Sequence, residues 1–285
     1  MNISEIEKDY EEFAKEVLNE YYQNWAGLKE ELNVTQIFQK YGQLFTPDNM
    51  AAVKKARETS SGDDRRRLNR LFGSLVDTYL SRQVTELTDR AVTLETTTTV
   101  EVDGTQVPFR STQSMVMNED DRSRRGRIHA ISERAVEIFN PVLEQRMNGL
   151  HETAERQGYR NYVDLYSEVK SIDYDRLAGE LNGYLEKTDS LHLDQLERAL
   201  KPIGVELQDV ERHDLLYLYR GKRFDAYFAR GGAVTVLRKT LEGMGLPFNG
   251  YPNIILDLDE RPKKDPRAAC FPLDVPKKII LGAMP

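Results

Sequence analysis

The chain has 285 residues, of which 31% are charged and 39% hydrophobic, and its formal net charge at pH 7 is −7. This composition favours long amphipathic helices with solvated faces over a β-sandwich, and the acidic balance argues against nucleic acid and anionic membranes as partners. The single cysteine, Cys270, excludes an internal disulfide and a zinc site built from several thiolates.

The N-terminal segment lacks the features of a secretory leader. It begins MNISEIEKDYEEF, with acidic residues where a signal peptide has a basic flank and an apolar core. No apolar run in the chain approaches the roughly 18 residues of a membrane-spanning helix. Together with the lone cysteine, these features predict a cytoplasmic protein without a membrane partner.

Helical patterns fill the first ninety residues. Ser4 and Glu7 have the spacing of a capping box. Apolar residues then recur every three or four positions on one helical face: Ile6, Tyr10, Phe13, Val17, Tyr21 and Trp25. Thr46 before Pro47 predicts the start of another helix, and residues 63–90 keep helical spacing. Because each helix has an apolar face, we expect them to pack against partners.

The pattern changes at residues 93–118, where threonine and valine dominate. Asp103 and Gly104 lie between two runs of alternating character, which is the strongest hairpin signal in the sequence. The sequence therefore predicts one β-hairpin, at about 93–118, inserted among the helices.

Helical spacing returns after residue 120. A helix containing Ile128 is expected to end before Gly158, Asp173 starts another helix, and residues 191–200 fill a further one. From Tyr251 onward the character changes again. Two strand-like runs, NIILDLDERP and KKIILG, are punctuated by prolines.

These elements together predict a mainly α fold. Residues 1–250 are expected to form a multi-helix lobe that includes the hairpin. Residues 251–285 are expected to begin a second domain, with a short β segment at about 253–282.

No set of residues has the spacing of a catalytic or metal site. The stretch from His151 to Glu155 has the start of the zinc-protease motif HExxH but lacks its second histidine, so a solvated surface pair is the favoured interpretation. The basic clusters 65–67 and 122–127 each follow acidic residues, and charge pairing at helix ends explains them without a nucleic acid. Cys270 on a predicted strand is interpreted as a small buried apolar residue rather than a nucleophile.

Several segments nevertheless have the order and character of one protein family. They are GYRNYVDLYSEV (158–169), RHDLLYLYRGKRFDAYF (212–228), LRKTLEGMGL (237–246) and NIILDLDERPKKDPRAACFPLDVPKKIIL (253–281), with looser pieces at LFTPDNM and EDDRSRRGRIHAI. In this order they resemble the region just upstream of the zinc site in the thimet oligopeptidase and oligoendopeptidase F family of zinc metallopeptidases. Roughly half of the chain carries this resemblance.

The resemblance implies a role for the last strands. In such peptidases an edge strand beside the metal binds extended peptide through main-chain hydrogen bonds. The resemblance places on that strand Ala268, Ala269, Cys270, Phe271 and Pro272. These residues would line the substrate cleft, and residues 278–281 would form the next strand. The competing interpretation is that the same side chains only pack a core.

The resemblance also implies a cofactor that this chain does not ligate. The family's HExxH motif and later glutamate supply the zinc ligands and the general base, and neither occurs in residues 1–285. The implied protein is the N-terminal part of a zinc-dependent metalloendopeptidase that hydrolyses short or unfolded peptides, and the chain alone is expected to be inactive. The alternative is a catalytically inactive helical protein that binds peptides or protein partners.

Overall fold

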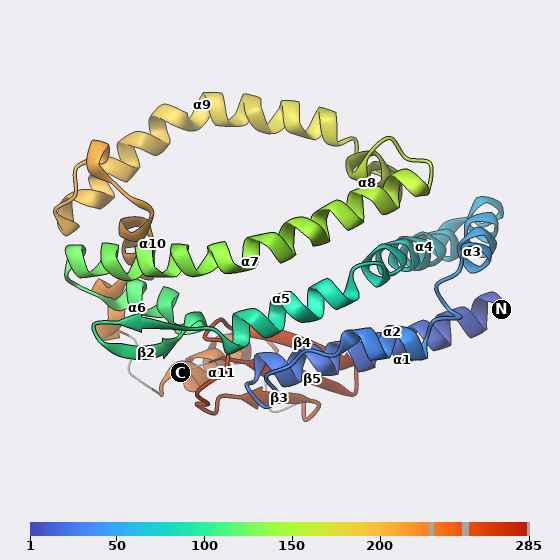
Figure 1. Ribbon diagram of the computed structural model, residues 1–285, viewed down its shortest axis with the longest axis horizontal. Helices are drawn as coiled ribbons and strands as arrows, with labels where there is room; N and C mark the ends of the chain where they lie inside the picture. Colours follow the sequence, from blue (N-terminus) through green and yellow to red (C-terminus); the bar gives the residue numbers. More distant parts are fainter. Residues whose placement is uncertain (228–230, 247–250, 284–285) are drawn as a thin grey trace. The chain divides into compact units, whose positions relative to one another are not determined.

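The computed structural model describes residues 1–227, 231–246 and 251–283. Within them the chain is mainly helical with a short C-terminal β segment, so the predicted fold class is confirmed (Figure 1). The α-helices are α1 (Ile3–Trp25), α2 (Val34–Lys40), α3 (Pro47–Thr59), α4 (Gly62–Arg82), α5 (Thr85–Thr97), α6 (Thr112–Asn118), α7 (Arg122–Arg156), α8 (Tyr162–Lys170), α9 (Tyr174–Leu200), α10 (Arg212–Arg220) and α11 (Ala233–Gly243). The strands are β1 (Thr99–Val102), β2 (Thr105–Pro108), β3 (Ile254–Asp257), β4 (Ala269–Asp274) and β5 (Lys278–Gly282).

The start of α1 differs from the prediction by two residues. The capping box consists of Asn2 and Glu5 rather than Ser4 and Glu7. The Asn2 amide donates to Glu5 Oε2 and the Glu5 amide donates to Asn2 Oδ1, each over 2.9 Å. Ser4 lies inside the first turn because α1 already begins at Ile3. Asparagine is as effective an N-cap as serine, so the local pattern permitted both registers.

Other predicted helix boundaries are confirmed. Thr46 Oγ1 accepts a hydrogen bond from the Asn49 amide at the start of α3, with Pro47 in the first helical position. Asp173 Oδ1 accepts from the Arg176 amide over 2.9 Å at the start of α9. Gly158 follows the end of α7 with a φ of +88°, a backbone conformation that favours glycine.

The hairpin is shorter than predicted. Its strands, β1 and β2, cover residues 99–108, and Asp103 and Gly104 take positive φ values of 50° and 79° at the turn. The predicted bounds of 93–118 were too wide, since α5 continues to Thr97 and a 3₁₀ helix, η1 (Phe109–Ser111), leads into α6. Alternation of apolar and polar residues is a signal of a half-buried strand, and here it holds only over the two short strands.

The helical run predicted at 63–90 is divided into α4 and α5. The Thr85 hydroxyl donates to the Arg82 carbonyl over 3.3 Å, which satisfies one of the carbonyl groups left open at the end of α4. Side-chain hydroxyls that compete for helix carbonyls are not visible in hydrophobic spacing. The break therefore escaped the sequence pattern.

The chain forms two compact units. Unit 1 comprises residues 1–20, 31–93 and 139–189, and unit 2 comprises residues 21–30, 94–138 and 190–285. The hairpin and strands β3 to β5 all belong to unit 2. The lobe boundary predicted at residues 250 and 251 adjoins residues 247–250, which lie outside the described residues, and it stays a prediction.

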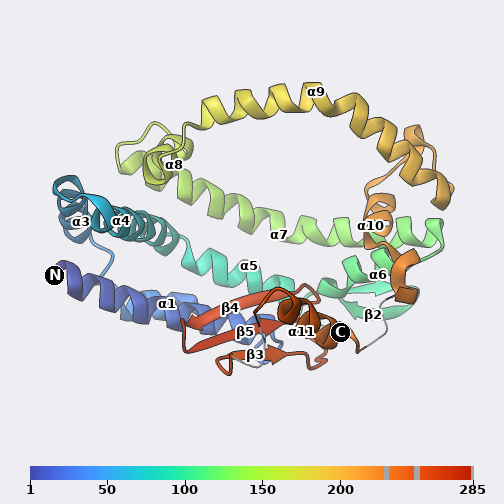
Figure 2. The ribbon, with the colours of Figure 1, turned by 180° about the vertical axis from the view of Figure 1, so that it is seen from behind.

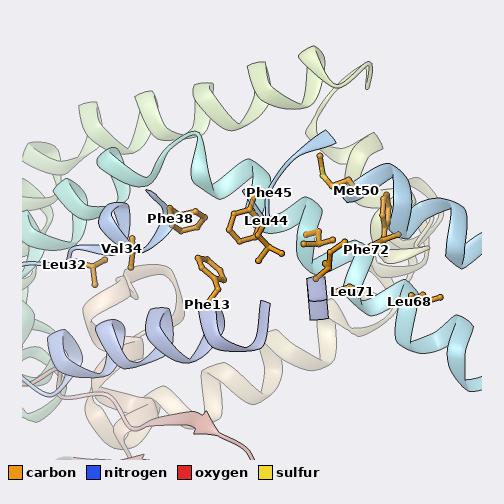
Figure 3. Close-up of a cluster of buried hydrophobic side chains, with 13 residues drawn as sticks. Phe13, Leu32, Val34, Phe38, Leu44, Phe45, Met50, Leu68, Leu71 and Phe72 are labelled. Carbon is orange, nitrogen blue, oxygen red and sulfur yellow. The ribbon is translucent and has the colours of Figure 1, made fainter. Parts of the chain in front are cut away.

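The core of unit 1 is built from the predicted apolar faces. The ring of Phe13, from the predicted face of α1, lies 5.0 Å from the ring of Phe38 and 4.8 Å from that of Phe45 (Figure 3). Ile6 and Leu75 are fully buried in the same cluster. Burial of these side chains supplies the hydrophobic stabilisation that the isolated helices lack.

Unit 2 contains a three-stranded sheet. Figure 2 shows β5 between β3 and β4. β3 runs parallel to β5, and β4 runs antiparallel to it. A second cluster, with Val100, Val116 and Ile128 at its centre, packs the hairpin and α6 against the first half of α7. Among the residues that the structure covers, no helix is long and apolar enough to cross a membrane.

Candidate functional site

β4 is an edge strand. It pairs with β5 in an antiparallel register that places Ala269 opposite Gly282 and Phe271 opposite Ile280. No other described strand pairs with its second side. An edge strand presents backbone N–H and C=O groups that can pair with an added peptide strand. This is the arrangement that the resemblance implies for residues 268–272.

The structure brings four of the five predicted site residues onto β4. Ala268 precedes the strand and is exposed, Ala269 is half-buried, and both Cys270 and Pro272 are exposed. The expectation that Cys270 is buried was therefore wrong. Phe271 is buried with 9% of its surface exposed, so its side chain packs a core and only its backbone is available at the edge.

The buried face of β4 is supported by the end of α1. The ring of Phe271 lies 5.5 Å from that of Tyr22 and 5.4 Å from that of Trp25. Trp25 Nε1 donates to the Arg267 carbonyl over 3.2 Å, and the Asp265 amide donates to the Trp25 carbonyl over 2.9 Å. These bonds fix the loop that leads into β4.

The opposite face of the sheet is apolar and incompletely buried. Cys270 pairs with Leu281 in register, and Leu281 pairs with Leu256 on the far strand. Leu256, Ile279 and Leu281 are all half-buried and Cys270 is exposed. Alternation along β4 thus separates a face packed on the end of α1 from a face that retains exposed apolar surface.

The strand pairing is irregular near its end. The β4 register shifts between Phe271 and Asp274, and Pro272 lies within that interval. Proline has no N–H to donate to a ladder and is found at edges and bulges of sheets. The irregularity therefore confines regular pairing to residues 269–271.

A buried ammonium group holds the loop after β3. Lys264 Nζ lies within 3.0 Å of four oxygens, namely Asp257 Oδ1 and the carbonyl oxygens of Asp257, Asp259 and Ala283. The Lys264 side chain is fully buried. Each of its three N–H groups has an acceptor within hydrogen-bond distance, so the ammonium group stabilises the fold rather than binding a ligand.

Asp257 is the anion of this cluster. Besides Lys264, it accepts hydrogen bonds from Tyr22 and Arg261. Burial alone would raise the pKa of Asp257, but hydrogen bonds from Arg261, Lys264 and Tyr22 outweigh burial and lower the pKa to about 2. Sequence reasoning missed this cluster. The only local signal was the density of charges directly after a predicted strand.

A second buried ion cluster joins α7 to α10. Arg125 Nη2 donates to Asp214 Oδ1 over 2.9 Å, and Arg122 donates to both carboxylate oxygens of Asp214. Burial alone would raise the pKa of Asp214, but the hydrogen bonds from both arginines outweigh burial and lower the pKa to about 2. The predicted pairing of this basic run with preceding acids holds for Arg124, which pairs with Glu119.

Among the described residues, no set of metal ligands surrounds residues 151–155. His151 is exposed, and its ring lies 5.5 Å from that of Tyr162. No group of three or more His, Cys, Asp or Glu side chains within the described residues could hold a metal ion. These residues therefore do not fit a zinc ion.

Comparisons with protein-family models, with curated proteins and with solved structures find no match to this chain. Its function is therefore inferred from the edge strand, the supports of that strand and the chemistry around it.

Proposed function

We propose that this chain is the N-terminal part of a cytoplasmic zinc-dependent metalloendopeptidase that hydrolyses short or unfolded peptides, and that β4 binds the extended substrate. One observation carries the proposal. β4 is paired on one side only, among the described strands, and it lies antiparallel to the central strand β5. The zinc ligands belong to the parent enzyme rather than to this chain.

The surroundings of β4 support a role in binding main chain rather than side chains. Ala269 and Cys270 are small, so a peptide backbone can approach the strand closely. The bonds from Trp25 hold the preceding loop. A rigid edge reduces the entropy lost when a ligand strand is added.

A second candidate function is protein interaction through α9. In unit 1 this helix exposes 52% of Leu181, 63% of Tyr184 and 60% of Leu185, all on one face. This apolar surface favours the alternative, in which an inactive helical protein binds peptides or partners.

Amide hydrogen exchange with an unlabelled unstructured peptide tests both proposals. Peptide pairing predicts slower exchange at residues 269–271 in the presence of the peptide. β3, the other edge of the same sheet, is the internal control and should not change. Protection confined to residues 177–188 would favour the helical interaction protein. An unchanged exchange pattern at peptide concentrations up to the millimolar range would reject β4 as a binding strand.

A further inference from the structure

A small cavity of about 120 Å³ lies in unit 2 beside the loop that leads into β4. Its lining includes Glu95, Arg110, Gln113, Asp265 and Arg267. The cavity is as large as a few water molecules. Charged side chains of both signs line it together with apolar surface from Phe109 and Pro266, so a ligand with a polar or charged group fits better than a wholly apolar one.

Arg110 is the least satisfied charged group in this lining. Only 9% of its side chain is exposed. Nη2 donates to Asn24 Oδ1 over 3.0 Å, while Nε and Nη1 are buried and have no hydrogen-bond partner among the described residues. Glu95 Oε1 lies 3.5 Å from Nε, close enough for charge attraction but without a hydrogen bond. A buried guanidinium with open N–H groups is costly unless an acceptor completes it.

The other acid of the lining does not complete Arg110. Asp265 Oδ1 accepts from the backbone amide and Nε of Arg267, each over 2.9 Å, and Oδ2 accepts from Arg267 Nη2 over 2.5 Å. Both oxygens of Asp265 are thus engaged by one neighbour. The Gln113 side chain is exposed, lines the same cavity and can add an amide donor.

The positive charge and open N–H groups of Arg110 favour a carboxylate as the ligand. The Nε–H and Nη1–H groups of Arg110, unpartnered among the described residues, carry positive charge, and a carboxylate oxygen is a strong acceptor for either of them. The available volume of about 120 Å³ accommodates a group of that size. The neighbouring loop determines where that carboxylate comes from, since Asp265 and Arg267 line the cavity and Ala269 starts β4 only two residues after Arg267.

We propose that this cavity binds the C-terminal carboxylate of the peptide that pairs with β4, with Arg110 as its principal partner. A strand added antiparallel to β4 has its C-terminus at the Ala269 end, beside the cavity. The inference rests on the proposed function and adds to it a substrate class, namely peptides with a free C-terminus located a few residues beyond the paired segment.

The test compares two fluorescently labelled peptides of identical sequence, one with a free C-terminal carboxylate and one with a C-terminal amide, by fluorescence anisotropy. We expect the carboxylate form to bind the wild-type chain about 10- to 100-fold more tightly, the usual range for a charge-assisted contact. Arg110→Gln should abolish this preference, and Gln113→Ala should reduce it. Arg223→Gln changes the net charge equally at an exposed arginine that does not line this cavity, and it should keep the preference.

Each of the other outcomes contradicts the carboxylate site, alone or together with the edge-strand proposal. Equal affinity of the two peptides for the wild-type chain, with β4 still protected from hydrogen exchange, overturns the carboxylate site and leaves the edge-strand proposal standing. A preference that survives in Arg110→Gln also overturns the site. Failure of both peptides to bind overturns the site together with the edge-strand proposal. The wild-type comparison decides the question even if Arg110→Gln fails to fold.

Discussion

The indole of Trp25 occupies the space that a side chain at position 282 would need. A Cβ built on Gly282 would lie 2.1 Å from Trp25 Cη2, well inside the contact distance of two carbon atoms. Gly282 ends β5 and pairs with both Ala269 and Asp257. The absence of a side chain at this position therefore lets the end of α1 pack directly on the sheet that contains the candidate site.

We expect Gly282→Ala to lower the free energy of unfolding by about 1–3 kcal/mol, because the added methyl group forces Trp25 or the strand to move. Urea denaturation measures the change. Gly179→Ala is the matched control, since a Cβ at this position in helix α9 would meet open space. It should instead stabilise the chain by about 0.5–1 kcal/mol through helix propensity. Equal effects of the two substitutions would contradict the packing of Trp25 on Gly282.

Removal of the buried Lys264 ammonium should lower the free energy of unfolding by more than Gly282→Ala does. Lys264→Met leaves the Asp257 carboxylate without one of its partners and removes the Lys264 donor from the carbonyl oxygens of Asp259 and Ala283, while the Asp257 carbonyl keeps its bond from the Ala283 amide. We expect a loss of about 3–5 kcal/mol in the free energy of unfolding. Lys263→Met removes the neighbouring lysine, which is 39% exposed and pairs with Glu30 at the surface. That control should cost less than about 1 kcal/mol. Similar losses in both variants would show that the Lys264 cluster adds little stability.

Sequence reasoning succeeded where the signal is local. Helical spacing placed Ile6 and Phe13 in the core, and Asp103 and Gly104 marked the turn of the hairpin. Strand character and prolines indicated β3 and β5, whereas the family resemblance placed the strand that the structure shows as β4. These features depend on neighbours along the chain, and local physical rules describe such neighbours well.

The features it missed depend on residues far apart in sequence. Arg125 and Asp214 are separated by 89 positions, and the arginine gave no local sign that it is buried. Arg110 lies in a stretch that was predicted to be strand, and only the fold places it beside the loop before β4. Alternation along the strand did not say which face Phe271 would bury. Tertiary packing decides such questions, so single-sequence patterns do not contain them.

Acid should destabilise the chain because two buried carboxylates are paired. The pKa values of Asp214 and Asp257 fall from 3.8 to about 2 in the folded protein. Since these two carboxylates bind protons more readily in the unfolded chain, the stability that they contribute is fully present above about pH 4 and is lost as the pH falls through about 2. Each carboxylate contributes about 2 kcal/mol to this loss.

Urea denaturation at several pH values from 6 to 2 measures this dependence. Arg122→Gln should make it shallower, because Arg122 is one of the two arginines that lower the pKa of Asp214. Arg176→Gln removes an exposed arginine paired with Glu180 and should leave the slope unchanged. A free energy of unfolding that stays constant from pH 5 to pH 2 would contradict the buried ion pairs.

Substitutions on the two faces of β4 should distinguish side chains that stabilise the sheet from groups that bind the peptide. Phe271→Ala removes a ring that packs on Tyr22 and Trp25, so we expect a loss of about 3–5 kcal/mol in the free energy of unfolding. Cys270→Ser changes an exposed side chain and should alter stability by less than about 0.5 kcal/mol. If the backbone of β4 binds peptide, Cys270→Ser should also keep peptide affinity within about threefold of the wild-type chain, since its main-chain groups are unchanged. A large loss of affinity in Cys270→Ser, with stability intact, would show that the side chain rather than the strand edge makes the contact.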